Sequence, residues 1–82
     1  MSNSKLYRTK ETTDYALDYF RTNDIKAEEV DKSFDMLYVW NKYNRQYIYW
    51  PTTGRWRSKN SRTGVTYMSK GVEDFDTRFL NN

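Results

Sequence analysis

Gln46-Tyr-Ile-Tyr-Trp50, Pro51-Thr-Thr-Gly54 and Arg55-Trp-Arg-Ser-Lys59 follow one another in the middle of the chain. The first and third of these runs are rich in aromatic residues, which favour β-strands. Between them, Pro51 presets its φ angle and Gly54 supplies a left-handed conformation, so the four residues predict a turn. The stretch therefore predicts a β-hairpin, from which the rest of the fold is built outward.

Strand formers also lie on either side of this hairpin. Phe34-Asp-Met-Leu-Tyr-Val-Trp40 predicts a strand before it, joined to the hairpin by the turn residues Asn41-Lys-Tyr-Asn44. Val65-Thr-Tyr-Met68 predicts either a fourth short strand or an extension of the third strand after a bulge. Residues 24–33 fit either a helical turn or an irregular connection, and the sequence leaves both open.

Helical patterns occupy the two flanks of the chain. Thr12 or Thr13 can cap a first helix, and Ser69 can cap a last one, with Glu73 and Asp74 in its first turn. Apolar residues recur at helical spacing after each cap. Those expected to face the core are Tyr15, Ala16, Tyr19 and Phe20 in the first helix, and Val72, Phe75, Phe79 and Leu80 in the last.

This element order predicts an α+β fold, with a three- or four-stranded antiparallel sheet flanked by an N-terminal and a C-terminal helix (α-β-β-β-α order). Eighty-two residues suffice for one domain. We expect a flexible N-terminus over residues 1–10 and a single α+β domain over residues 11–82. Eight Tyr, four Phe and three Trp provide an aromatic core. Because a core of this size is thin, a homodimer is also considered.

Composition argues against several classes of chemistry. The chain has neither Cys nor His, which removes disulfides, thiolate zinc sites and the commonest general base. The acidic runs at residues 28–31 and 73–76 are more simply interpreted as solvated or helix-terminal carboxylates than as metal ligands. We therefore expect no enzyme, no cofactor and no metal. No apolar stretch approaches the ~20 residues of a membrane span, so we expect no membrane partner and a cytoplasmic location, in the host cell if the protein is viral.

Charge is strongly segregated along the chain. Residues 37–70 carry seven basic side chains and no acid, whereas residues 1–36 and 71–82 are each net acidic. The overall charge of +3 averages these regions and conceals the contrast. A basic, aromatic block of this kind is typical of nucleic-acid-binding surfaces.

Strand alternation predicts which side chains form that surface. Arg55, Arg57 and Lys59 share one face of their strand, and Trp56 lies on the other. If Trp56, Ile48 and Trp50 point inward, then two tyrosines of the preceding strand lie outside, beside the cations. Loop cations would extend the patch to phosphates. The expected nucleic-acid-binding residues are Lys42, Arg45, Tyr47, Tyr49, Arg55, Arg57, Lys59 and Arg62, with DNA and RNA not distinguished.

The same charge pattern is compatible with roles that involve no nucleic acid. Solvent-facing Arg and Lys on strands keep a protein soluble and protect sheet edges from aggregation. An acidic protein partner would be attracted to the same patch. Alternatively, Trp40, Trp50 or Trp56, if exposed without flanking Arg, would anchor a protein-interaction surface for a host protein or a second copy.

The motif Tyr49-Trp-Pro-Thr-Thr-Gly-Arg-Trp-Arg57, followed by Ser69-Lys-Gly-Val-Glu-Asp-Phe75, resembles small accessory proteins of tailed bacteriophages, including those of cyanobacteria. The resemblance covers roughly residues 38–80 and implies a phage accessory role without assigning any residue. The element order also resembles the double-stranded RNA-binding domain. However, its loop histidine is absent here, and acids follow Lys70 at the start of the last helix. A sheet that binds DNA through its exposed face fits the charge pattern better.

Overall fold

The computed structural model describes residues 11–31, 35–60 and 62–80. Five strands, β1 (Ala27–Asp31), β2 (Met36–Trp40), β3 (Gln46–Trp50), β4 (Arg55–Ser58) and β5 (Tyr67–Met68), form one sheet in chain order. Every neighbouring pair is antiparallel, so the sheet is a meander. The predicted α+β class is confirmed. The expected flexible segment 1–10 and the expected strand start at Phe34 lie outside the described residues.

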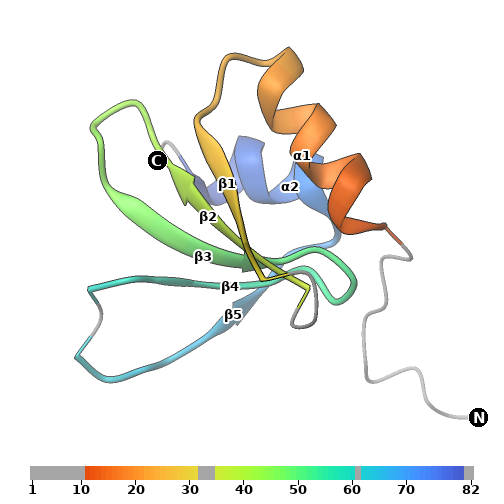
Figure 1. Cartoon of the computed structure of the whole chain (residues 1–82). Helices are drawn as coiled ribbons and strands as arrows, with labels where there is room; N and C mark the ends of the chain where they lie inside the picture. Colours follow the sequence, from red (N-terminus) through yellow and green to blue (C-terminus); the bar gives the residue numbers. More distant parts are fainter. Residues whose placement is uncertain (1–10, 32–34, 61, 81–82) are drawn as a thin grey trace, which may run out of the picture.

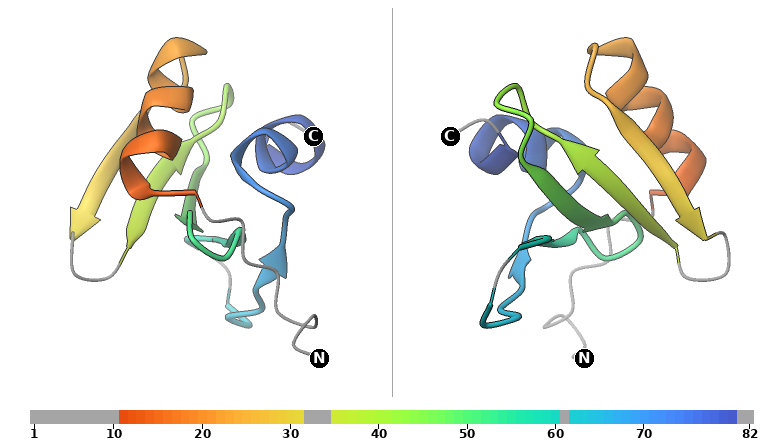
Figure 2. Two further views of the ribbon diagram at one scale, coloured as in Figure 1. Left: turned by 90° about the vertical axis from the view of Figure 1, so that its right-hand side faces the viewer. Right: turned by 60° about the vertical axis from the view of Figure 1, so that its left-hand side comes forward.

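Two helical segments pack on the same face of this sheet. The first, α1 (Thr13–Thr22), lies beside β1 and β2, and α2 (Val72–Phe75) continues directly into a π-helical turn, η3 (Asp76–Leu80). In the right-hand view of Figure 2 the strands lie in front and both helices behind them. Figure 1 shows the same one-sided arrangement. The sheet therefore has an inner face, which is covered by the helices, and an outer face without a helix.

The sheet has one strand more than the sequence predicted. Residues 27–31 form β1, where the sequence suggested a helical turn or an irregular connection. Glu28 and Glu29 are weak strand formers, so local preference does not favour this strand. Pairing with β2 overrides it, since Ala27 lies opposite Val39 and α1 packs against the strand. The expectation of a separate fourth strand near Met68 is met by β5, which pairs with Arg55 and Trp56.

The first helix begins where the sequence predicted, but the residues that it buries differ slightly from those expected. The Thr12 hydroxyl accepts a hydrogen bond from the Tyr15 backbone N–H at 3.0 Å. Ala16, Leu17 and Phe20 are buried, whereas Tyr15 is 55% exposed, so its expected core position is wrong. Leu17 takes the place of Tyr15 because α1 contacts both the sheet and α2.

The inner face holds an aromatic core. Phe75 stacks on Tyr49 at 4.7 Å between ring centroids, and Phe20 meets both rings edge to face. Such pairs add about 0.5–1.5 kcal/mol each beyond the area that they bury. The two helices are also tied by the Tyr19 hydroxyl, which donates to Asp76 at 2.9 Å. Partial burial and this carboxylate raise the pKa of Tyr19 to about 12.

The start of α2 is built differently from the prediction. Ser69 does not cap the helix, because its buried hydroxyl bonds the Gly54 and Gly71 carbonyl oxygens. Gly71 is the N-cap residue, and the Val72 N–H donates to the Glu11 carboxylate at 2.9 Å. Burial raises the pKa of Glu11, partly offset by that hydrogen bond. The helix is thus capped from a residue 61 positions earlier, which local sequence patterns do not reveal.

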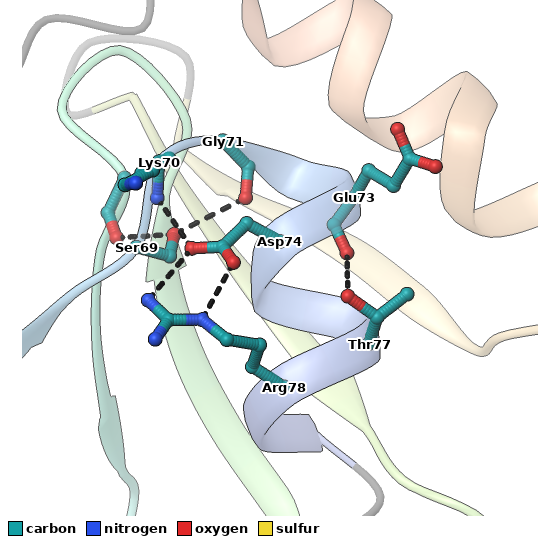
Figure 3. Close-up of polar contacts among 8 residues, drawn as sticks. Ser69, Lys70, Gly71, Glu73, Asp74, Thr77 and Arg78 are labelled. Atoms are coloured by element: carbon teal, nitrogen blue, oxygen red, sulfur yellow. Dashed lines mark hydrogen bonds and ion pairs between the residues drawn. The ribbon is translucent and has the colours of Figure 1, made fainter.

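Asp74 links the residue Lys70, which precedes α2, to Arg78 of η3 (Figure 3). Its carboxylate accepts from the Lys70 N–H at 2.7 Å and from the Arg78 Nε at 2.6 Å. The hydrogen bond from Arg78 is the main cause that lowers the pKa of Asp74 below its usual range. Because the folded pKa is lower than the unfolded one, this stabilisation exists above the unfolded pKa and is lost as the pH falls through the folded pKa.

Asp74→Ala is expected to lower the free energy of unfolding by about 1 kcal/mol at neutral pH. The difference from wild type should shrink as the pH falls below the unfolded pKa of about 4 and through the lower folded pKa. Urea unfolding followed by tryptophan fluorescence at several pH values measures this difference in unfolding free energy. Asp74→Asn, which keeps an oxygen for the Lys70 N–H, is the control and should lose less. An alanine effect that is equally large at the lowest pH would contradict this assignment.

Candidate nucleic-acid interface

The register of the hairpin decides which residues lie on the outer face. Trp50 pairs with Arg55 across the Pro51–Gly54 turn, and Tyr49 pairs with Trp56. Directly paired residues on antiparallel strands point to the same side. Trp56 therefore shares the inner face with Tyr49, while Trp50 shares the outer face with Arg55.

Two of the predicted site residues are consequently misplaced. Tyr47 and Tyr49 are 7% and 0% exposed and belong to the core beneath the helices. The sequence argument placed Trp50 and Trp56 on the same face, which a four-residue turn between paired Trp50 and Arg55 forbids. Alternating the side chains outward from the Trp50–Arg55 pair gives the face of the sheet on which each residue lies. Burial also raises the pKa of the Tyr49 hydroxyl well above its usual range, so neither its ring nor its hydroxyl is offered to a ligand.

Other aromatic residues take their place on the outer face. Tyr38 pairs with Ile48, which pairs in turn with Arg57, so these three form one row across the sheet. Trp40 and Gln46 form the neighbouring row, and Trp50 and Arg55 lie in the row on the other side. The three rings are half-buried, which fixes them while leaving part of each accessible. We define the outer face by Tyr38, Trp40, Gln46, Ile48, Trp50, Arg55, Arg57 and Lys59.

The predicted cations do lie on this face. Arg55 and Lys59 are exposed and Arg57 is half-buried against Ile48, itself only 5% exposed. Alternate residues of a strand are about 7 Å apart, so the three form a row along β4. Lys59 reaches across β3, with its Nζ 5.3 Å from the centre of the Tyr38 ring. None of the three forms an ion pair with a carboxylate in the described part of the chain, so their charges are not neutralised by the helices.

A fourth cation on this surface was not predicted. The Lys26 Nζ lies 4.5 Å from the centre of the Trp40 ring, and the Lys26 carbonyl accepts from the Trp40 N–H at 3.0 Å. Cation–ring contacts of this kind contribute about 0.5–1 kcal/mol at exposed sites. Lys26 belongs to the segment that the sequence left ambiguous, and only the pairing of β1 with β2 brings it here.

The remaining predicted cations lie in loops at one end of the sheet. Lys42 and Arg45 are exposed in the β2–β3 loop, and Arg62 is exposed in the β4–β5 loop. The Lys59 N–H donates to the Gln46 carbonyl at 3.0 Å, which places these two loops at the same sheet end. The loop cations therefore extend the charge of the outer face past the ends of its strands.

Carboxylates are sparse on this surface. Glu28 pairs with Tyr38 and thus points to the outer side of the edge strand β1. Asp35 lies at the opposite end of the sheet, where it accepts from the Thr52 N–H at 3.0 Å and from the Thr13 hydroxyl. The described residues contain no group of three or more carboxylates that could hold a metal ion. Among the described residues, cations outnumber acids on this surface, and those of β4 lie beside the aromatic rings of β2 and β3.

Comparison of the chain with protein-family models, curated proteins and solved structures finds no match. The resemblance to phage accessory proteins therefore stays a prediction. No helix of the described residues is long and apolar enough to cross a membrane.

Proposed function

We propose that the protein binds single-stranded nucleic acid across the outer face of its sheet. The observation that carries this proposal is a set of half-buried aromatic rings beside a row of unneutralised cations on one sheet surface. Aromatic platforms beside a cationic groove suit unpaired bases, because every base offers a π-face for stacking. Arg55, Arg57 and Lys59 would contact phosphates, while Tyr38, Trp40 and Trp50 would stack on bases or sugars.

The arrangement favours a single strand over a duplex. Rings that are half-buried in a sheet surface cannot reach bases that are stacked inside a helix. The three β4 cations lie to one side of the rings, as a backbone beside its own splayed bases would require. Each stacked base contributes about 1–3 kcal/mol, so two or three would add substantially to the electrostatic attraction.

The first experiment is a fluorescence-anisotropy titration of labelled single-stranded oligonucleotides of mixed sequence at several salt concentrations. If about four phosphates are neutralised, the logarithm of the affinity should fall with the logarithm of salt at a slope of about −3. A duplex of the same sequence should bind more weakly at equal salt. Absence of binding to any oligonucleotide at low salt would refute the proposal.

A protein-interaction role is the second candidate, and one observation favours it. Val65, Tyr67 and Met68 are 46%, 51% and 36% exposed beside the outer edge of the two-residue strand β5. Met68 pairs with Arg55 at the end of a cationic row, whereas Tyr67 pairs with Trp56 and points to the other side of the sheet. This edge could pair with a second copy or with a host protein. Sedimentation equilibrium of wild type and Tyr67→Ser tests this second role. The substitution should abolish a dimer formed at this edge, while the affinity for oligonucleotides should not change.

A further inference from the structure

A cleft of about 330 Å³ opens where the outer face meets the loop end of the sheet. Its walls are the connection between α1 and β1, residues 23–26, and the end of β2 with the following loop, residues 40–44. Both lie in the upper part of Figure 1. Trp40 belongs to the cleft as well as to the outer face, so a ligand can pass from one to the other. The volume is at the lower end of the range for small-molecule sites, about 300–1,000 Å³.

The loop wall of the cleft is held in place before any ligand arrives. The Asn41 side-chain oxygen accepts from the Tyr43 and Arg45 N–H groups, each at 2.9 Å. Its side-chain nitrogen donates to the Leu80 carbonyl at 3.1 Å, which ties the loop to η3. The opposite wall is joined to the sheet by the bond between Trp40 and Lys26. A pre-formed cleft avoids part of the ordering cost of binding.

The polar groups that line the cleft are chemically mixed. Lys26 and Lys42 supply positive charge, whereas Asp24 supplies a carboxylate and Asn44 an amide. The side chains of Asp24 and Asn44 make no hydrogen bond with the residues that the structure describes. Both residues adopt a left-handed backbone, with φ of 59° and 66°, which Asp and Asn tolerate better than most residues. The Asp24 carboxylate repels a phosphate placed directly beside it but is a good acceptor for a hydroxyl group.

We infer that this cleft holds one ribonucleotide of the bound strand and so makes the protein prefer RNA to DNA. The inference rests on the proposed function. The base lies against the Trp40 indole, and the phosphate is paired with Lys26 and Lys42. The 2′-hydroxyl of the ribose donates to the Asp24 carboxylate. Deoxyribose lacks that donor, which would leave the carboxylate beside a phosphodiester without a compensating hydrogen bond.

The test compares two labelled oligonucleotides of one sequence composed only of A and C, one of RNA and one of DNA, against the full chain. Wild type is expected to bind the RNA about tenfold more tightly, the effect of one hydrogen bond to a charged group. Asp24→Asn keeps the tolerance for the left-handed backbone but removes the acceptor-only carboxylate. It should lose most of this preference, because the uncharged amide no longer repels the DNA strand and offers the ribose hydroxyl only a neutral acceptor. Asp18→Asn, an exposed site on α1 with the same change in net charge, should keep it.

A second measurement uses a single nucleotide in place of an oligonucleotide. Adenosine 5′-monophosphate titrated into ¹⁵N-labelled protein should shift the Asn44 side-chain amide and the Trp40 indole signals, and 2′-deoxyadenosine 5′-monophosphate should shift them less. Equal affinity of wild type for RNA and DNA would overturn the inference while leaving the proposed function intact. Failure to bind either oligonucleotide would overturn both. An unchanged preference for RNA in Asp24→Asn would overturn the inference, because it would show that the Asp24 carboxylate does not distinguish ribose from deoxyribose.

Discussion

Gly54→Ala is expected to cost about 3 kcal/mol or more of unfolding free energy. The Gly54 backbone has a φ of +78°, and a Cβ added there would lie 2.3 Å from the Ser69 carbonyl oxygen. That oxygen is a backbone atom, so no side-chain rotation relieves the clash. The left-handed conformation alone accounts for about 1–2 kcal/mol. A domain of this size has roughly 4–12 kcal/mol in total, so the variant should be partly unfolded or unfold at low urea.

Gly64→Ala is the matched control for this variant. Gly64 has a similar φ of +69°, but no heavy atom lies within 4 Å of its added Cβ. Its loss should be confined to the conformational cost, about 1 kcal/mol. Urea unfolding followed by circular dichroism compares the two. Equal losses would show that the close approach of Gly54 to Ser69 does not contribute to stability.

Replacing Arg55 and Arg57 together with glutamine is expected to reduce affinity for single-stranded nucleic acid about 100-fold at low salt and to flatten the salt slope by about 1.5. Under the proposed function each guanidinium contacts a phosphate, and neither forms an ion pair with a carboxylate of the described residues. Anisotropy titrations at four salt concentrations measure both quantities. Arg21→Gln, an exposed site on α1, is the control and should change little. A similar loss per charge in both variants would indicate a non-specific effect of net charge.

Tyr38→Leu separates base recognition from attraction to any polyanion. Leucine can still cover Ile48, but it removes a ring available for stacking. Oligonucleotide affinity should fall by about 1–3 kcal/mol, whereas binding of heparin, which has no bases, should not change. Equal losses for both ligands would argue that the ring supports the sheet without contacting bases.

The sequence was sufficient for those elements whose signals are local. The Thr12 cap, the Pro51–Gly54 turn and the strand character of the residues on either side of it could all be read from neighbouring residues. The strand at residues 27–31 could not, because its glutamates favour no strand and only its partner β2 stabilises it. Likewise, Glu11 caps α2 across the whole domain, and no periodicity marks that contact.

In the candidate surface, too, some features could be predicted from neighbouring residues and others depended on strand pairing. The basic character of residues 37–70 could be predicted, and Arg55, Arg57 and Lys59 lie together outside. The accompanying aromatics were wrong because Trp56, Ile48 and Trp50 were assumed to share the inner face, whereas Ile48 and Trp50 lie opposite Arg57 and Arg55. In this domain Tyr49 is fully buried and Trp50 is not. The pairing of Trp50 with Arg55 fixes the phase, and that pairing depends on the length of the turn.

The neighbour-only order of the strands has a consequence for synthesis on the ribosome. Each strand can pair as soon as the next one emerges, since no strand must wait for a distant partner, and such local topologies fold quickly. Phe75 and Leu80, however, are made after all five strands, and they cover Tyr49 and its neighbours. A nascent chain that has reached only β5 would hold a formed meander with its aromatic side uncovered. This intermediate is the species most exposed to aggregation or to capture by chaperones.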